Sequence, residues 1–259
     1  MTTVADILHF MESIAPPYMA EGWDNVGLLC GRKDKEVHKI LVALDPFRTV
    51  IDEAIALGAD LIVTHHPLIF RDPLMAVNED SEAGRCVLTL IEHGIAAINA
   101  HTNLDMAPGG VNDVLAQTLG LSNIGIINPT ENYGLLRTGE VAEQSLESFL
   151  GTVKTALNCK GLRYVDGGRP VRIVAVGGGS CADGMQEALA AGCDTFVTSD
   201  IKYNQFRTAF ELGLSLIDAG HFHTENPVMP VVAAGLRAAF PGVEVIFSEN
   251  HTDQMNFFV

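Results

Sequence analysis

Two adjacent histidines follow an apolar run near residue 65. The run Leu61–Thr64 has the β-branched centre of a buried parallel strand, and His65, His66 and Pro67 come directly after it. They are therefore expected beyond the C-terminal end of a strand, where open α/β sheets bind ligands. Pro67 favours extended backbone at His66, and neighbouring side chains of an extended chain point to opposite sides. The pair suits two metal ions with one imidazole each, although two histidines taken alone are more often ordinary loop residues.

An internal repeat changes that interpretation. The segment from Ile40 to Thr64 recurs between Ile173 and Thr198, and each copy has the pattern of a strand, a helix and a second strand. The match continues into the next strand, where Gly94 to His101 corresponds to Gly213 to His221 with one extra residue. The chain is therefore predicted to form two similar α/β lobes with polar residues at equivalent strand ends.

Each copy of the repeat also ends in a histidine and a carboxylate. Asp105 lies four residues beyond His101, and Glu225 lies four residues beyond His221. In the second copy Asp200 stands near the place of the paired histidines. Imidazole and carboxylate groups delivered to one cleft would repel each other or lose solvation without a cation, so convergence of the lobes favours metal binding.

Composition limits the class of protein. The 259 residues are 47% hydrophobic, 19% charged and carry a formal net charge of −16, which suits a globular chain and disfavours a broad phosphate-binding face for nucleic acid. No apolar run is long enough to span a membrane, and the N-terminus lacks a signal-peptide pattern, so a cytoplasmic protein is expected. The five cysteines have no C-x-x-C spacing and are expected to be reduced packing thiols.

Helical spacing and end signals predict further elements around the repeat. Helices are expected at about 4–14, 49–57, 82–92, 111–119 and 228–240, and a turn with an edge strand at 21–31. The stretch 123–133 is rich in Gly, Pro and Asn and reads as a boundary, while 132–172 matches no pattern that we can name. The lobes are predicted as residues 1–125 with about 226–259, and residues 126–225.

Ordered motifs along nearly the whole chain carry a family resemblance. They are Trp23–Gly27, His65–Phe70, Ala100–Asp105, Gly109–Asp113 and Gly220–Glu225. In this set the chain resembles the NIF-three family, also called YbgI-like, whose members are frequently named GTP cyclohydrolase 1 type 2 homologues. The resemblance implies two α/β domains with mixed sheets, a dinuclear metal centre in the cleft between them, and a toroidal homohexamer.

The resemblance also implies roles for single residues. By motif position the metal ligands are His65, His66, Asp105, His221 and Glu225, with Glu225 bridging the two ions. Two further histidines, His101 and His223, are not metal ligands in the family pattern. These histidines, with two polar residues of the second copy, are expected to orient ligands or to face a substrate; the four are His101, His223, Asp200 and Lys202.

Imidazole and carboxylate ligands without thiolate suit Zn, Fe, Mn, Co or Ni, and the sequence does not choose among these divalent ions. Two such ions suit hydrolysis, in which a hydroxide held between them would attack a purine ring or a related small molecule. Guanine as the substrate rests on the family name alone. The alternative is a noncatalytic metal-binding hexamer or a regulatory interaction protein.

Overall fold

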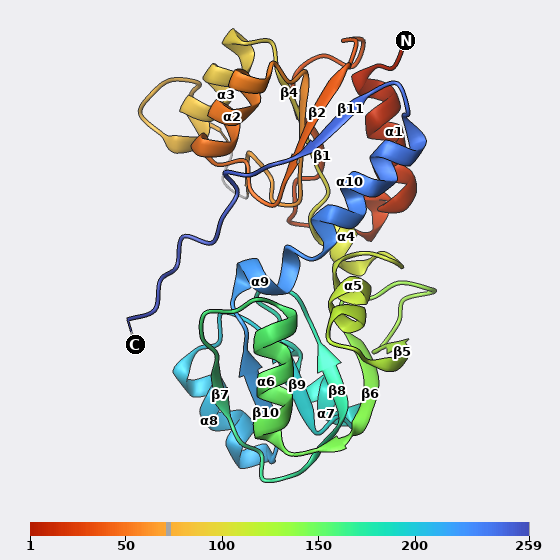
Figure 1. Cartoon of the computed structure of the whole chain (residues 1–259), viewed down its shortest axis with the longest axis vertical. Coiled ribbons are helices and arrows are strands. Elements are labelled where there is room, and N and C mark those ends of the chain that lie inside the picture. The colour runs from red at the N-terminus through yellow and green to blue at the C-terminus, as the bar shows by residue number, and fades with distance from the viewer. Residues whose placement is uncertain (71–73, 259) are drawn as a thin grey trace. The chain divides into compact units, whose positions relative to one another are not determined.

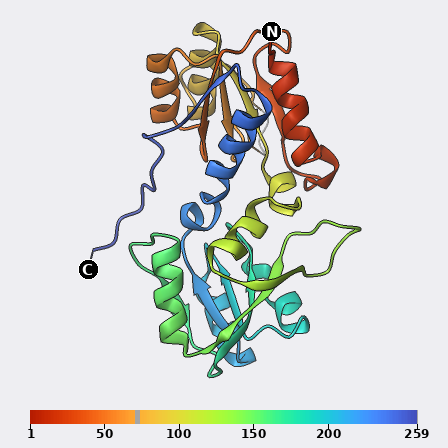
Figure 2. The same ribbon diagram turned by 45° about the vertical axis from the view of Figure 1, so that its right-hand side comes forward.

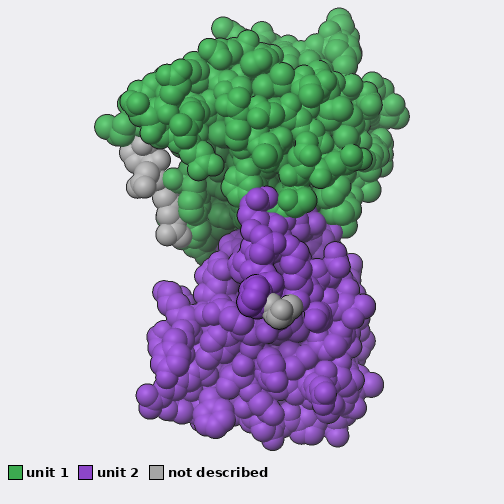
Figure 3. Space-filling view, turned by 60° about the vertical axis from the view of Figure 1, so that its left-hand side comes forward, with its two compact units in different colours: residues 1–104, 229–252 green, residues 105–228, 253–259 purple. Residues whose placement is uncertain are grey.

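The computed structural model describes residues 1–70 and 74–258, which form two compact units. Unit 1 comprises Met1–Leu104 and Met229–Thr252, and unit 2 comprises Asp105–Val228 and the C-terminal residues from Asp253 onward. Figure 1 labels their elements, and Figure 3 colours the two units separately. Each unit has its own mixed sheet and its own core, which confirms the predicted fold class of two α/β lobes with mixed sheets.

Unit 1 is built on a five-stranded sheet in the order β1-β4-β3-β2-β11. Four strands are parallel, and β1 is antiparallel to β4 at one edge. Every residue of β3 is buried, as expected for a strand covered on both faces. The strands are β1 (Gly27–Cys30), β2 (Lys39–Ala43), β3 (Leu61–Thr64), β4 (Ala96–Asn99) and β11 (Glu244–Phe247).

Helices cover both faces of this sheet. In Figure 1, α2 and α3 lie on one face, and α1 and α10 lie on the other. Leu41 and Ile62 of the strands pack with Val50 of α2 and Leu90 of α3 in one apolar cluster, which burial of their side chains stabilises. The helices are α1 (Val4–Ile14), α2 (Arg48–Leu57), α3 (Glu82–Glu92) and α10 (Val228–Ala239).

Unit 2 is built on a six-stranded sheet in the order β5-β6-β8-β9-β10-β7. The central strands β8, β9 and β10 are parallel, and β5, β6 and β7 are antiparallel to their neighbours. The region 132–172, left unassigned from the sequence, supplies β6, a helix and β7. The strands are β5 (Ser122–Ile126), β6 (Arg137–Gln144), β7 (Arg163–Val165), β8 (Val171–Val176), β9 (Thr195–Thr198) and β10 (Ser215–Asp218).

Two apolar layers flank the sheet of unit 2 because alternate strand residues face opposite sides. Val197 packs with Phe149 of α6, while the neighbouring Phe196 packs with Met185 of α7 and Ala209 of α8. Figure 2 shows α6 on the opposite side of the sheet from α7 and α8. The helices are α5 (Val111–Thr118), α6 (Leu146–Ala156), α7 (Met185–Ala190) and α8 (Tyr203–Leu212).

The internal repeat is larger in the structure than in the sequence. Apart from one short 3₁₀ turn in each, before β1 and before α7, unit 1 runs α1-β1-β2-α2-β3-α3-β4 and unit 2 runs α6-β7-β8-α7-β9-α8-β10. In each copy an antiparallel strand pairs with the last of three parallel strands, β1 with β4 and β7 with β10. A short helix follows each copy, α4 (Thr102–Met106) and α9 (His221–Glu225). Asp105 and Glu225 therefore lie on equivalent helices.

Most predicted elements fall within two residues of the observed ones, because their end signals work as expected. Thr3 caps α1, accepting a hydrogen bond from Asp6 N–H, and Gly58 ends α2 in the left-handed conformation at φ +64°. The short helix α9 was not predicted, since His221–Glu225 read as a loop in the sequence. Within residues 1–70 and 74–258, no helix has the length and apolar character that crossing a lipid bilayer requires.

Candidate metal-binding site

The paired histidines lie at the end of β3, where the backbone turns. The amides of His65 and His66 both donate to the carbonyl oxygen of Leu44, at 3.2 and 2.9 Å. The hydroxyl of Thr64 donates to the carbonyl of His66 at 2.7 Å. These bonds replace the expected extended backbone with a bend, and the two imidazole centroids are only 4.9 Å apart. The side chains therefore do not point to opposite sides.

Each of these imidazoles is oriented through its Nδ1 atom. Nδ1 of His65 is 2.8 Å from the carbonyl oxygen of Ala100, and Nδ1 of His66 is 2.6 Å from a carboxylate oxygen of Asp45. A carbonyl oxygen can only accept, so Nδ1 of His65 carries the proton, and the Asp45 oxygen as acceptor favours the same tautomer in His66. Nε2 is then the nitrogen that each ring would offer to a metal ion, in the arrangement usual for metal-binding histidines.

A third imidazole, that of His101, lies beside this pair. Its Nδ1 is 2.9 Å from a carboxylate oxygen of Asp24, which also accepts the amide of Thr102 at 3.0 Å. The side chain of Asp24 is fully buried. Burial alone would raise its pKa, but the hydrogen bonds from His101 and Thr102 outweigh burial and lower it, so Asp24 stays ionised. One ligand atom from each of His65, His66 and His101 lies within 4.8 Å of the others.

In unit 2 the short helix α9 brings a histidine and a carboxylate together. His221 and Glu225 are four residues apart, which places them on one helix face, and Nε2 of His221 is 3.1 Å from a carboxylate oxygen of Glu225. Nδ1 of the same ring is 2.6 Å from Asp200. Burial opposes protonation, but hydrogen bonds to Asp200 and Glu225 and their negative charges together raise the pKa of His221 to about 11.

A glycine loop after β8 packs directly against these groups. A Cβ atom on Gly179, which has φ +64°, would lie 2.1 Å from Oε1 of Glu225 and 3.1 Å from Nε2 of His221. The amide of Gly178 donates to the side chain of Asn112 at 2.6 Å. The loop makes a tight turn after β8, and only residues without side chains leave room for Glu225.

Asp105 lies on α4 and is 6% exposed. Its backbone carbonyl accepts a hydrogen bond from the side chain of Asn112 at 3.0 Å, so Asn112 joins Asp105 to the glycine loop. Burial, and then the charges of Asp105 and Glu225, raise the pKa of the Cys181 thiol well above its ordinary value. Cys181 is thus kept as a thiol, and all five cysteines are buried and free, as the sequence predicts.

The other predicted polar residues of unit 2 differ in their surroundings. His223 is held between the carbonyl of Leu157, 3.1 Å from its Nδ1, and the carboxylate of Asp253, 3.2 Å from its Nε2. Lys202 is exposed and is the N-cap residue of α8. Its backbone amide donates to the side chain of Gln205 at 2.8 Å. Neither contact involves a predicted metal ligand.

Three residues that orient these groups were not singled out from the sequence. Asp24 appeared to be part of an ordinary turn, Asp45 is a single carboxylate at the end of β2, and Asn112 is a polar residue at the start of α5. Asp45 had a usable signal, because it follows its strand as His65 follows β3. The contacts of Asp24 and Asn112 span 77 and 66 residues of chain, to His101 and Gly178, and sequence spacing does not report them.

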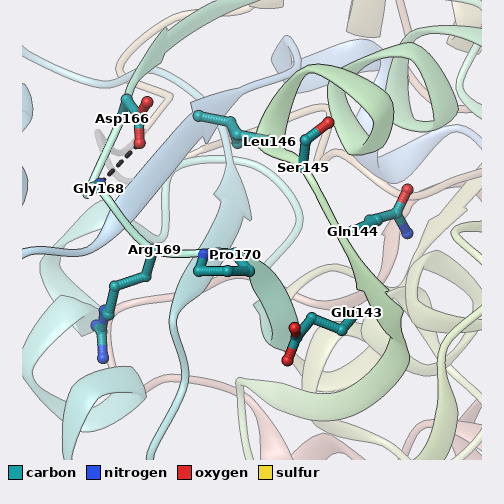
Figure 4. A pocket seen from close by; sticks show the side chains of 8 residues that line it. All are labelled: Glu143, Gln144, Ser145, Leu146, Asp166, Gly168, Arg169 and Pro170. Atoms are coloured by element: carbon teal, nitrogen blue, oxygen red, sulfur yellow. Dashed lines mark hydrogen bonds between the residues drawn. The ribbon is translucent and has the colours of Figure 1, made fainter.

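A hollow of about 490 Å³ in unit 2 is separate from these groups (Figure 4). The guanidinium of Arg169 donates to the carbonyl of Gly213, and Asp166 accepts the amide of Gly168 at 2.7 Å. The lining residues are Glu143, Gln144, Ser145, Leu146, Asp166, Gly168, Arg169 and Pro170. They include none of the predicted metal ligands, so this hollow is not the predicted site.

Fold and site together define a class: a protein of two duplicated α/β units with buried His, Asp and Glu groups that could hold metal ions at their strand ends. Residues 2–254 match the family described as Duf34/NIF3 (NGG1p interacting factor 3). The chain belongs to the NIF3 family, which confirms the resemblance seen in the sequence motifs.

Relatives and solved structures agree with this assignment. The chain is 38% identical to a "GTP cyclohydrolase 1 type 2 homolog" of Clostridium perfringens, over 97% of this chain and 98% of the relative. A protein of the same name from Clostridium acetobutylicum is 32% identical over 98% of both chains. The structure of a Bacillus cereus protein related to NIF3 superimposes with a TM-score of 0.94 at 28% identity, covering 100% of this chain and 99% of the other. A hypothetical protein of Staphylococcus aureus gives 0.91 at 31%, covering 99% of both chains.

Proposed function

We propose that the protein is a dinuclear metal-dependent hydrolase of the GTP cyclohydrolase 1 type 2-like kind. The proposed ligands are His65, His66, Asp105, His221 and Glu225, holding two divalent ions. The observation that carries the proposal is the way these side chains are held. His65 and His66 are oriented through Nδ1 by a carbonyl and a carboxylate, and His221 and Glu225 are paired on one helix face.

Chain connectivity supports joining the groups of the two units into one site. Asp105 is the first residue of unit 2, directly after Leu104 of unit 1, and Glu225 lies four residues before Met229, where the chain re-enters unit 1. Four residues of fully extended chain span at most about 14 Å. Both carboxylates are thus tethered close to unit 1, and Asp105 is four residues from His101.

The chain's own residues would do three things in such a site. The neutral imidazoles of unit 1 would offer Nε2 to the ions, and Asp105 and Glu225 would offset the positive charge. The carbonyl of Ala100 would hold the ring of His65, and Asp45 would hold the ring of His66 and raise its basicity as a ligand. Two divalent ions would supply Lewis acidity and lower the pKa of a water molecule, which is the chemistry of hydrolysis. The names of the relatives suggest a purine nucleotide as substrate.

A direct test combines metal content with activity. We expect about two ions per chain in metal-repleted protein, and hydrolysis of GTP or of a generic phosphodiester only by the repleted form. Apo protein and Asp105→Asn protein should be inactive. Activity that is equal in the apo, variant and repleted forms would belong to a different site, and the absence of metal from all forms would refute the proposal.

The second candidate is a noncatalytic metal-binding assembly or a regulatory interaction protein. The family description favours it, because it names an interacting factor and not an enzyme. The two candidates differ in one measurement: tightly bound metal together with no turnover of any substrate in the screen would make the noncatalytic function the better one.

A further inference from the structure

Three imidazoles within unit 1 are arranged so that one ion could be bound without any residue of unit 2. His65, His66 and His101 each place Nδ1 against an oxygen acceptor: Ala100 O at 2.8 Å, Asp45 Oδ1 at 2.6 Å and Asp24 Oδ1 at 2.9 Å. We propose that unit 1 by itself binds one transition-metal ion through Nε2 of these three histidines. His101 is then a metal ligand, a role that the five-ligand set does not give it.

The tautomers of all three rings suit this role. Their acceptors are one carbonyl and two carboxylates, and each of these fixes the proton on Nδ1 and directs the lone pair to Nε2. A metal-binding histidine almost always gives its other N–H to such an acceptor. One ring nitrogen from each of the three histidines lies within 4.8 Å of the others, so the three rings are close enough to form a tripod.

The geometry needs only small movements to close on an ion. At Zn–N distances of about 2.0–2.1 Å, tetrahedral coordination brings ligand nitrogens to about 3.3 Å from one another. Separations of at most 4.8 Å are within about 1.5 Å of that value, a change that side-chain rotation supplies. The ring of His101 lies at 65° to that of His65 and 75° to that of His66, with centroids 5.2 and 5.5 Å away, so the three rings are close together and not stacked.

The surroundings hold His101 in this position. Its ring packs edge-to-face against Trp23 at 6.3 Å and Phe70 at 5.5 Å between centroids. Asn25 donates to the carbonyl of Ile69 at 2.8 Å, which ties the turn carrying Trp23 to the segment carrying Phe70. Rotation of the imidazole away from the other two would break the bond to Asp24 and these ring contacts. His101 is therefore prepared to act as a ligand before an ion arrives.

The donor set selects the kind of ion. Three neutral imidazoles suit Zn²⁺, Co²⁺, Ni²⁺ or Cu²⁺ and disfavour Mg²⁺ and Ca²⁺, which prefer oxygen ligands. The side chains of His66 and His101 are 20% and 13% exposed, so a fourth ligand from solvent can reach the ion. This site does not depend on the proposed hydrolase function, since it uses unit 1 alone. If the dinuclear centre forms, the tripod is where its first ion would enter.

The test removes the carboxylates of unit 2 from the full-length chain and counts ions. In Asp105→Asn/Glu225→Gln protein we expect one Zn²⁺ per chain, measured by competition with a chromophoric chelator. Adding His101→Asn should weaken this ion by more than about 100-fold, because loss of an orienting partner alone costs about 10–100-fold. Asparagine is chosen because its amide can still donate to Asp24 while lacking Nε2. His38→Asn, at an exposed histidine paired with Glu36, is the matched control and should change nothing.

A second measurement uses the wild-type chain, in case the multiple variant folds poorly. When one equivalent of Zn²⁺ is added to apo protein, the Nε2 signals of all three histidines should shift together in long-range ¹H–¹⁵N spectra of the imidazoles. An unmoved His101 signal in the wild type would overturn the proposal. So would unchanged affinity on adding His101→Asn to a double variant that is folded by circular dichroism. If only the dinuclear centre fails to form, the wild-type chain would bind one ion in place of two, and the signals of all three histidines would still shift.

Discussion

The imidazole of His221 is held between the carboxylates of Asp200 and Glu225, and this fixes how the metal-free protein responds to pH. Its folded pKa of about 11 lies above the ordinary value of 6.5. A raised histidine pKa contributes stability that is present in full below about pH 6.5 and is lost as the pH rises toward 11. The substitution His221→Gln should therefore destabilise the metal-free protein more at pH 6.5 than at pH 10.

This pH dependence can be measured by urea denaturation in the presence of a chelator at both pH values. The matched control is His38→Gln, whose exposed ion pair with Glu36 should contribute little at either pH. An equal effect of His221→Gln at pH 6.5 and pH 10 would contradict a protonated His221 in the folded chain.

Gly179 gives a second prediction at the scale of single residues. Its φ of +64° strains any other residue, and an added Cβ would also lie 2.1 Å from Oε1 of Glu225. Gly192 has φ +83° with nothing within 4 Å of such a Cβ. Gly192→Ala should cost only the backbone strain of about 1–2 kcal/mol. Gly179→Ala should cost more and should also lower metal affinity by at least about 10-fold.

Thermal melts and chelator competition on the two alanine variants separate these effects. If Gly192→Ala and Gly179→Ala lose stability equally and bind metal equally well, the close approach of the glycine loop to Glu225 has no energetic consequence.

At the scale of elements, Asn112 joins three segments of unit 2. Its side chain is fully buried, accepts the amide of Gly178, and donates to the carbonyls of Asp105 and Leu135 at 3.0 and 2.6 Å. Each buried group left without its hydrogen bond costs about 1–3 kcal/mol. Asn112→Ala should thus lower the free energy of unfolding by about 3 kcal/mol or more.

Urea denaturation of Asn112→Ala checks this value. Asn204→Ala on the exposed face of α8 is the control and should stay within about 0.5 kcal/mol of wild type. An effect of Asn112→Ala as small as the control would mean that water or a shifted backbone replaces all three bonds.

The secondary-structure elements differ in how far the sequence could predict them. The three repeated parallel strands of each unit were predictable because their apolar runs and the glycines that follow their helices recur, Gly58 as Gly192 and Gly94 as Gly213. The edge strands β1 and β7 were not recognised as part of the repeat, since edge strands face solvent and their residues are less constrained. The bend at His65 was missed because it depends on the Leu44 carbonyl, which accepts both histidine amides.

For the candidate site, residue types and their spacing indicated the candidate metal ligands but not the residues that orient them. His221 and Glu225 were recognisable from their spacing of four residues, although the helix that pairs them was not. Asp24 lies just before β1, and its partner His101 lies just after β4. The two residues meet because β1 pairs with β4, which is a property of the sheet order and not of the local sequence.

At the scale of the whole molecule, we expect the toroidal homohexamer that the family resemblance implies. Size-exclusion chromatography with light scattering should give six times the chain mass of 27.7 kDa, or about 166 kDa. The charge of −16 per chain adds up in such an assembly, so the hexamer should be more stable at moderate salt than at very low salt. A chain that remains monomeric at micromolar concentration would contradict the expectation.

The order in which the ribosome releases the chain matters for unit 1, because β11 is its edge strand and pairs with β2. All of unit 2 up to Val228 emerges before Glu244–Phe247 does. Unit 1 is therefore begun first and completed last, and β2 keeps one row of unpaired backbone groups while some 200 further residues are made. A nascent chain stalled before residue 244 would expose that edge to neighbouring chains, so aggregation during synthesis should be most sensitive to changes in β11.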